Sequence, residues 1–179
     1  MLRILWQELT SGLHDSQQLA RVVIRLLAAM LLGGLVGVQR ERTRKPAGLR
    51  THMLVSVATA AFIIACSAGG LSSEGLSRVI QGIVTGIGFI GAGTILKVSQ
   101  EHEVKGLTTA ASVWMTAAIG VTVGLGSLGI ALMITLLALL VLALVRLEHS
   151  IEHGHHHHEE NNHDQNDGRS ENLTPTGPH

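Results

Sequence analysis

The sequence predicts an all-α, polytopic membrane protein built as a bundle of about five transmembrane helices. Hydrophobic residues make up 46% of the 179 residues and charged residues only 15%, a composition unlike that of a water-soluble domain. Five segments meet or approach the roughly 20 apolar residues that cross a bilayer core, and none of them contains Asp or Glu. We expect the spans over residues 19–38, 51–69, 79–98, 107–125 and 128–145.

Residues 1–18 precede the first expected span and form an extracytoplasmic segment in this prediction. They contain acids, amides and a His, and they lack the basic start, long apolar run and small-residue cleavage site of a signal peptide. The first span carries Arg21 and Arg25 one helical turn apart near its outer end. Two interpretations remain open, because these side chains could extend to the headgroups or bind a lipid phosphate or an acid of a partner.

The loop between the first two spans reads QRERTRKPAGLR and carries five basic residues against the single acid Glu41. By the positive-inside rule this loop is cytoplasmic. An odd number of spans then places the N-terminus outside and the C-terminus in the cytoplasm. Basic residues further along the chain that fall on the same side are Lys97, Lys105 and Arg146. Those near the outer ends are Arg21, Arg25 and Arg78.

The third span contains TGIGFIGAGTIL, which has the G-x-G-x-x-G spacing of a dinucleotide-binding turn. Such a turn requires a preceding strand, a following helix and an acid about 20 residues further on. Here the glycines lie within an apolar run, so the spacing does not indicate a nucleotide site. At 100° per residue, two small-residue faces result, formed by Gly82, Gly86 and Gly93 and, opposite them, by Gly88, Gly91 and Ala92.

Close helix contacts in lipid depend on small residues, so these two faces predict a third span at the centre of the bundle with a neighbour on each side. The fourth span is its expected partner. In an alternative interpretation, the glycines let the helix break and expose backbone carbonyls to a cavity. Residues predicted to serve packing or a pathway are Gly82, Gly86, Gly88, Gly91, Gly93, Gln81, Thr108, Thr109 and Trp114.

Three blocks of the chain carry a resemblance to a known family: GLVGVQRERTRKPAGLRTHMLV, SRVIQGIVTGIGFIGAGTIL and VKGLTTAASVWMTAAIGVTVGLG. In this order they resemble the MgtC/SapB family of bacterial inner-membrane proteins, over about residues 20–147. The resemblance implies a multi-pass protein of the bacterial inner (plasma) membrane, linked to magnesium limitation, virulence or acid survival. It also implies a regulator or accessory of ion pumps or ATP synthase rather than a pump.

The chain departs from the family pattern at two places. Gln39 stands where many members have a Glu before the basic loop, so a role for that carboxylate does not carry over. After the domain over residues 19–147 comes a polar tail, residues 148–179, where some members have an ACT-like domain. We therefore expect the short SapB-like branch, without ligand sensing by such a domain.

Polar groups gather at the expected cytoplasmic ends of the spans. In one interpretation they form a basic face that engages a phosphate, a lipid headgroup or an acidic partner protein. In the other, the cations set the orientation while Thr51 and Thr108 cap helices. The residues of this predicted face are Arg40, Arg42, Arg50, His52, Lys97 and Lys105.

The tail over residues 148–179 has low hydrophobicity and is predicted to be disordered. Its histidines suit Zn²⁺ or Ni²⁺ rather than Mg²⁺, although the tail could instead be a solubilising segment or a purification tag. The candidate metal ligands are His153, His155, His156, His157, His158 and His163.

Together these features favour a non-enzymatic accessory or regulator of membrane transport proteins in magnesium or ion homeostasis. The alternative is a small carrier or channel for Mg²⁺ or another divalent cation, with the third span as its path. The expected partners are the lipid bilayer, an ion pump or ATP synthase and a second copy of the chain, and no nucleic acid. No cofactor is expected apart from metal at the tail, because the spans offer no carboxylates of the kind that bind Mg²⁺.

Overall fold

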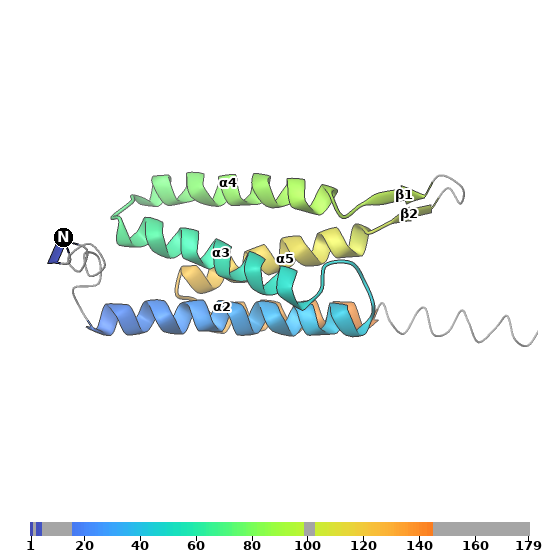
Figure 1. Ribbon diagram of the computed structural model, residues 1–179, viewed down its shortest axis with the longest axis horizontal. Coiled ribbons are helices and arrows are strands. Elements are labelled where there is room, and N and C mark those ends of the chain that lie inside the picture. Colours follow the sequence, from blue (N-terminus) through green and yellow to red (C-terminus); the bar gives the residue numbers. More distant parts are fainter. Residues whose placement is uncertain (2, 5–15, 99–102, 145–179) are drawn as a thin grey trace, which may run out of the picture. The chain divides into compact units, whose positions relative to one another are not determined.

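The computed structural model describes residues 1, 3–4, 16–98 and 103–144 (Figure 1). Internal contacts divide the chain into Met1–Leu139 and Leu140–His179, and the contacts and sites discussed below lie in the first unit. Among the described residues, four helices are long and apolar enough to cross a membrane: α2 (Ser16–Arg42), α3 (Leu49–Ala68), α4 (Ser73–Ala92) and α5 (Leu107–Gly124). A shorter apolar helix covers Leu128–Leu144. The prediction of an all-α, multi-pass membrane protein is confirmed.

The connection between α2 and α3 is short and closely bonded. The hydroxyl of Thr43 donates to two carbonyls in the last turn of α2, at 3.1 and 2.9 Å. Arg44 and Ala47 have φ angles of 52° and 59°, in the left-handed region that residues other than glycine rarely adopt. The Glu41 carboxylate accepts the N–H of Leu49 at 3.0 Å, so the loop folds back onto the first residue of α3.

The third predicted span is misplaced along the sequence. α4 begins at Ser73 rather than residue 79 and ends at Ala92 rather than residue 98. Ser72 is the N-cap of α4, and its hydroxyl accepts the N–H of Gly75 at 3.2 Å. This cap lets the helix begin at Ser73 although its first turn is polar. After α4, β1 (Leu96–Val98) pairs in antiparallel fashion with β2 (Glu103–Lys105), a hairpin that the sequence analysis did not predict.

Glycines spaced four residues apart bring α2 against α3. A Cβ placed on Gly33 would lie 2.6 Å from the Cβ of Ser56, and one on Gly37 would lie 2.6 Å from the Cα of Leu49. Real side chains do not approach that closely, so neither position has room for a methyl group. The backbones of the two helices therefore meet directly, as small residues permit in membrane bundles.

A second pair of glycines does the same between α5 and α3. A Cβ on Gly124 would lie 2.7 Å from the Cβ of Ile63, and one on Gly120 would overlap the Thr59 hydroxyl. α5 has nine buried residues, more than any of the other three long helices. α3 and α5 thus form the centre of the bundle.

The prediction that the third span is central, with neighbours on both sides, is wrong. The buried residues of α4 are Ile87 and Gly91, and Ile87 packs with Val113 and Ala117 of α5. α5 is its main partner, as expected, but its outer face has no neighbour in the described chain. Positions where an added Cβ would meet nothing within 4 Å are Gly82, Gly86 and Gly88. The helix is also continuous from Ser73 to Ala92, which contradicts the alternative of a local break.

Arg25 joins α2 to α5 at the opposite end of the bundle from the 43–48 loop. Its Nη1 donates to the carbonyl of Gly124 at 3.0 Å, where α5 ends and its last carbonyls need partners. Arg21, one turn earlier, is exposed. Neither of the two interpretations left open for these arginines included this contact of Arg25 with another helix of its own chain.

Candidate functional site

Polar side chains are buried along the interface of α2, α3 and α5. Burial of an unpaired polar group is costly, more so inside a membrane protein, so such a concentration marks a candidate site. The buried polar residues contributed by these three helices are Arg40, His52, Ser56, Thr59, Thr109, Ser112 and Thr116. Arg40, His52 and Thr109 were among the residues predicted from the sequence; the others were not, because Ser and Thr are common in apolar spans.

Arg40 is the buried cation of this site, with 4% of its surface exposed. It lies near the end of α2, and its Nη2 donates to the hydroxyl of Thr109 in the first turn of α5. The Nε of Arg40 is buried without a hydrogen-bond partner in the described chain. The ion pair recorded among the described residues joins Arg78 to Glu74 on the surface of α4, so Arg40 has no carboxylate counter-ion there.

His52 occupies the centre of the site and is fully buried. Its Nδ1 lies 3.0 Å from the carbonyl of Gly48, which can only accept, so Nδ1 carries the hydrogen. Its Nε2 lies 3.3 Å from the hydroxyl of Ser112, and that hydroxyl also donates to the carbonyl of Thr109 at 2.8 Å. Ser112 has one hydrogen, which the imidazole Nε2 and the carbonyl of Thr109 share or compete for.

Only some residues of the predicted basic face lie at the surface of the protein. Arg42, Arg50 and Lys105 are exposed, whereas Arg40 and His52 are buried. Lys97 lies in β1. The structure therefore separates the exposed cations of the predicted set from a buried pair, Arg40 and His52, that belongs to the polar network.

The alternative interpretation, in which Thr51 and Thr108 cap helices, is wrong at both positions. The N-cap of α3 is Gly48 and that of α5 is Gly106, and neither has a side-chain cap. Gly106 has a φ of 103° and packs against the carbonyl of Thr94, so only glycine fits there. Both helices begin at the end of the bundle where α2 ends (Figure 1).

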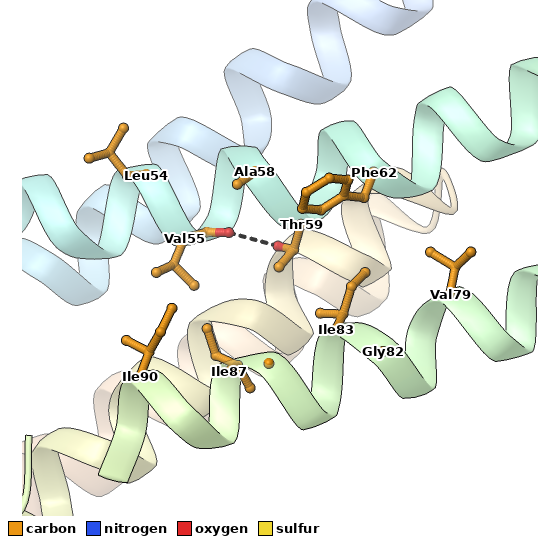
Figure 2. A pocket seen from close by; sticks show the side chains of 11 residues that line it. Leu54, Val55, Ala58, Thr59, Phe62, Val79, Gly82, Ile83, Ile87 and Ile90 are labelled. Carbon is orange, nitrogen blue, oxygen red and sulfur yellow. Dashed lines mark hydrogen bonds between the residues drawn. The ribbon is translucent and has the colours of Figure 1, made fainter. Parts of the chain in front are cut away.

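A second feature is an apolar groove of about 610 Å³ between α3 and α4, shown in Figure 2. Leu54 and Phe62 line it from α3, and Ile83 and Ile90 line it from α4. Thr59 also reaches it, but its hydroxyl is bonded to the carbonyl of Val55 at 2.9 Å. Because its lining is apolar, the groove resembles the surrounding lipid and is not suited to water or ions.

The other predicted packing or pathway residues are dispersed. Gly82 and Gly86 line the groove, and a Cβ on Gly91 would lie 3.5 Å from Ala110 of α5. Gln81, Gly88, Gly93 and Thr108 are exposed, and so is Trp114 of α5. The glycines that hold the bundle together are Gly33, Gly37, Gly120 and Gly124. Their four-residue spacing is typical of close helix contacts, but Gly82 and Gly86 share it, so the spacing alone does not identify them.

The six candidate metal ligands of the tail lie outside the described residues. Within the described ranges, no three His, Cys, Asp or Glu side chains gather in a way that could hold a metal ion.

Comparison with known proteins gives consistent results. The family model described as the MgtC family matches residues 26–151. SrpB of Synechococcus elongatus is 44% identical over 130 residues, which cover 66% of this chain and 71% of SrpB. YhiD of Escherichia coli K12, whose name proposes a magnesium transporter, is 42% identical over 130 residues, covering 69% of this chain and 60% of YhiD. MgtC of Salmonella typhimurium LT2 is 44% identical over 124 residues, covering 69% of this chain and 52% of MgtC. The chain thus spans about half to seven-tenths of these relatives, and no solved structure matches it.

Proposed function

The chain belongs to the MgtC family, and on that premise we propose that it acts in magnesium homeostasis or stress adaptation as an accessory of other membrane transport proteins. It is a multi-pass membrane protein, and we place it in the bacterial inner membrane with the basic 39–50 loop on the cytoplasmic side. In this proposal the chain carries out no chemical reaction and assists a pump or ATP synthase that is already in the membrane.

The observation that carries the proposal is the interior of the α2–α3–α5 bundle. Its polar network contains the guanidinium of Arg40 and no carboxylate among the described residues. Mg²⁺ requires oxygen ligands, usually including one or two carboxylates, and a buried cation repels it. The glycine contacts of Gly33 and Gly120 also close the space between the helices. Such an interior supports a role through contacts rather than as a cation path.

Magnesium uptake into two kinds of vesicle tests the proposal. The first kind contains only the purified protein, with an indicator of Mg²⁺ inside. The second kind is prepared from the membranes of bacteria that lack their own copy of the chain, with and without the protein restored. Folded protein in the first kind is verified by its helical circular dichroism.

We expect no Mg²⁺ entry above that of protein-free vesicles in the first kind, and a changed uptake rate in the second kind when the protein is restored. Entry into vesicles that contain the protein alone would establish the carrier function and overturn the proposal. Equal uptake by native vesicles with and without the chain would also contradict it, because an accessory must alter the activity of proteins present there.

A further inference from the structure

Three helix ends meet at one end of the bundle. α2 ends there and both α3 and α5 begin there (Figure 1). The close approach of Gly37 to Leu49 joins α2 to the start of α3, and the bond from Arg40 to Thr109 joins α2 to the first turn of α5. The positive ends of two helix dipoles are therefore directed at the same place.

Both of these helix starts have glycine caps. Because Gly48 and Gly106 have no side chain, neither supplies an acceptor to the first-turn N–H groups. The carboxylate of Glu41 accepts one of them, the N–H of Leu49, at 3.0 Å. Helix starts whose first-turn N–H groups are not bonded by a capping side chain bind anions, as the phosphate sites of many proteins do.

Arg40 supplies the second, independent observation. Its side chain is directed at the first turn of α5, its exposure is 4%, and its Nε has no partner among the described residues. An arginine that only complemented the negative end of α2 would not need burial, and Arg42, which is exposed, already does so. A buried guanidinium donor without an acceptor calls for an anionic acceptor.

We propose that Arg40, together with the first turns of α3 and α5, binds a phosphoryl group. The oxygen atoms of a phosphate match the donors available: the Nε–H of a planar guanidinium, uncapped backbone N–H groups and the exposed hydroxyl of Thr108. The exposed Arg42, Arg50 and Lys105 attract such an anion to this end. The group comes either from the headgroup of an anionic phospholipid or from inorganic phosphate in the aqueous phase.

The 43–48 loop is held to the end of α2 next to the site. The hydroxyl of Thr43 and the N–H of Lys45 both donate to the backbone carbonyl of Arg40, at 2.9 and 3.2 Å. Since only 4% of Arg40 is exposed, a phosphate reaches its Nε only when the groups that cover this side chain shift.

The test uses the full chain in lipid nanodiscs and separates the two sources. In one arm, discs of a neutral galactolipid, whose headgroup contains no phosphate, receive inorganic phosphate, with chloride at the same ionic strength as the reference. In the other arm, a quarter of the lipid is phosphatidylglycerol and no phosphate is added. Each arm measures thermal unfolding and the hydrogen exchange of backbone amides. Variants Arg40→Lys, which keeps the charge but removes the Nε, and Arg50→Gln, a matched change of an exposed cation, are compared with the wild type.

We expect one source to raise the unfolding temperature of the wild type and to slow amide exchange at residues 49–51 and 107–109. Arg40→Lys should weaken the apparent affinity at least tenfold, and Arg50→Gln by less than threefold. Slower exchange only with phosphatidylglycerol identifies a lipid headgroup, and slower exchange with phosphate identifies the free anion.

The proposal is overturned if neither source slows exchange at both helix starts, or if Arg50→Gln and a folded Arg40→Lys weaken binding equally, since that result reflects overall charge. If Arg40→Lys does not fold, the exchange measurements on the wild type decide the matter. Binding here does not depend on the accessory role, so the magnesium uptake experiment can succeed or fail separately.

Discussion

Replacement of Gly120 by Ala tests the central contact of the bundle. The added Cβ would overlap the hydroxyl of Thr59 and the backbone carbonyl of Ser56 on α3. Thr59 could rotate only by giving up its bonds to the carbonyls of Val55 and Ser56, at 2.9 and 3.0 Å. The carbonyl of Ser56 cannot move unless α3 itself moves. The substitution therefore forces α3 and α5 apart.

The magnitude follows from two opposing effects. Overpacking of a close contact costs about 1–3 kcal/mol, and the upper part of that range applies because backbone is involved. Ala is favoured over Gly within a helix by about 1 kcal/mol. We expect the free energy of unfolding of Gly120→Ala to fall by about 2 kcal/mol.

Gly88→Ala is the matched control, because an added Cβ there meets nothing within 4 Å. In this variant only the higher helix propensity of Ala acts, without overpacking. It should therefore be as stable as the wild type, or more stable by up to about 1 kcal/mol. Unfolding in mixed micelles with increasing SDS, followed by far-ultraviolet circular dichroism, gives both values. Equal stability of the two variants would show that α3 and α5 do not meet at Gly120, and the assignment of the bundle centre would be wrong.

Two further substitutions test the ends of the helices in the same assay. Arg25→Met removes the hydrogen bond to the carbonyl of Gly124 and should lower the free energy of unfolding by about 1–2 kcal/mol. Arg21→Met, at an exposed position, should change the free energy of unfolding little. An equal loss of stability in both variants would show that the hydrogen bond of Arg25 is not specific. Arg44→Gly removes the steric cost of a left-handed residue and should raise stability by up to about 1 kcal/mol. Arg42→Gly, a substitution within α2, should lower stability by a similar amount, and a loss in both variants would contradict the backbone explanation.

The presence of the apolar helices could be predicted from the sequence, but which glycines pack against a neighbouring helix could not. Apolar runs of sufficient length identify spans because the bilayer sets their length. The pairs Gly33–Gly37, Gly82–Gly86 and Gly120–Gly124 share one spacing, yet only the first and third are packed. Spacing shows that a helix has a face that permits close approach, but the neighbour that uses this face is decided by the assembly of the whole bundle.

The candidate site could be predicted only in part for a similar reason. Arg40 stands in a basic loop sequence that sets orientation, and nothing local distinguishes it from the exposed Arg42 two residues later. Its burial depends on Thr109, which is 69 residues away in the chain. Ser112 likewise enters the network through His52, 60 residues before it. Pairings over such distances are a property of the tertiary fold.

The position of α4 at the edge of the bundle has a consequence for biosynthesis. α2 and α3 are consecutive and in close contact, so they can associate as soon as both have entered the membrane. α4 is synthesised before α5 but packs mainly against it through Ile87 and Val113. During translation, α4 therefore stays exposed to lipid in the bilayer until α5, the helix against which it packs, has been synthesised and inserted.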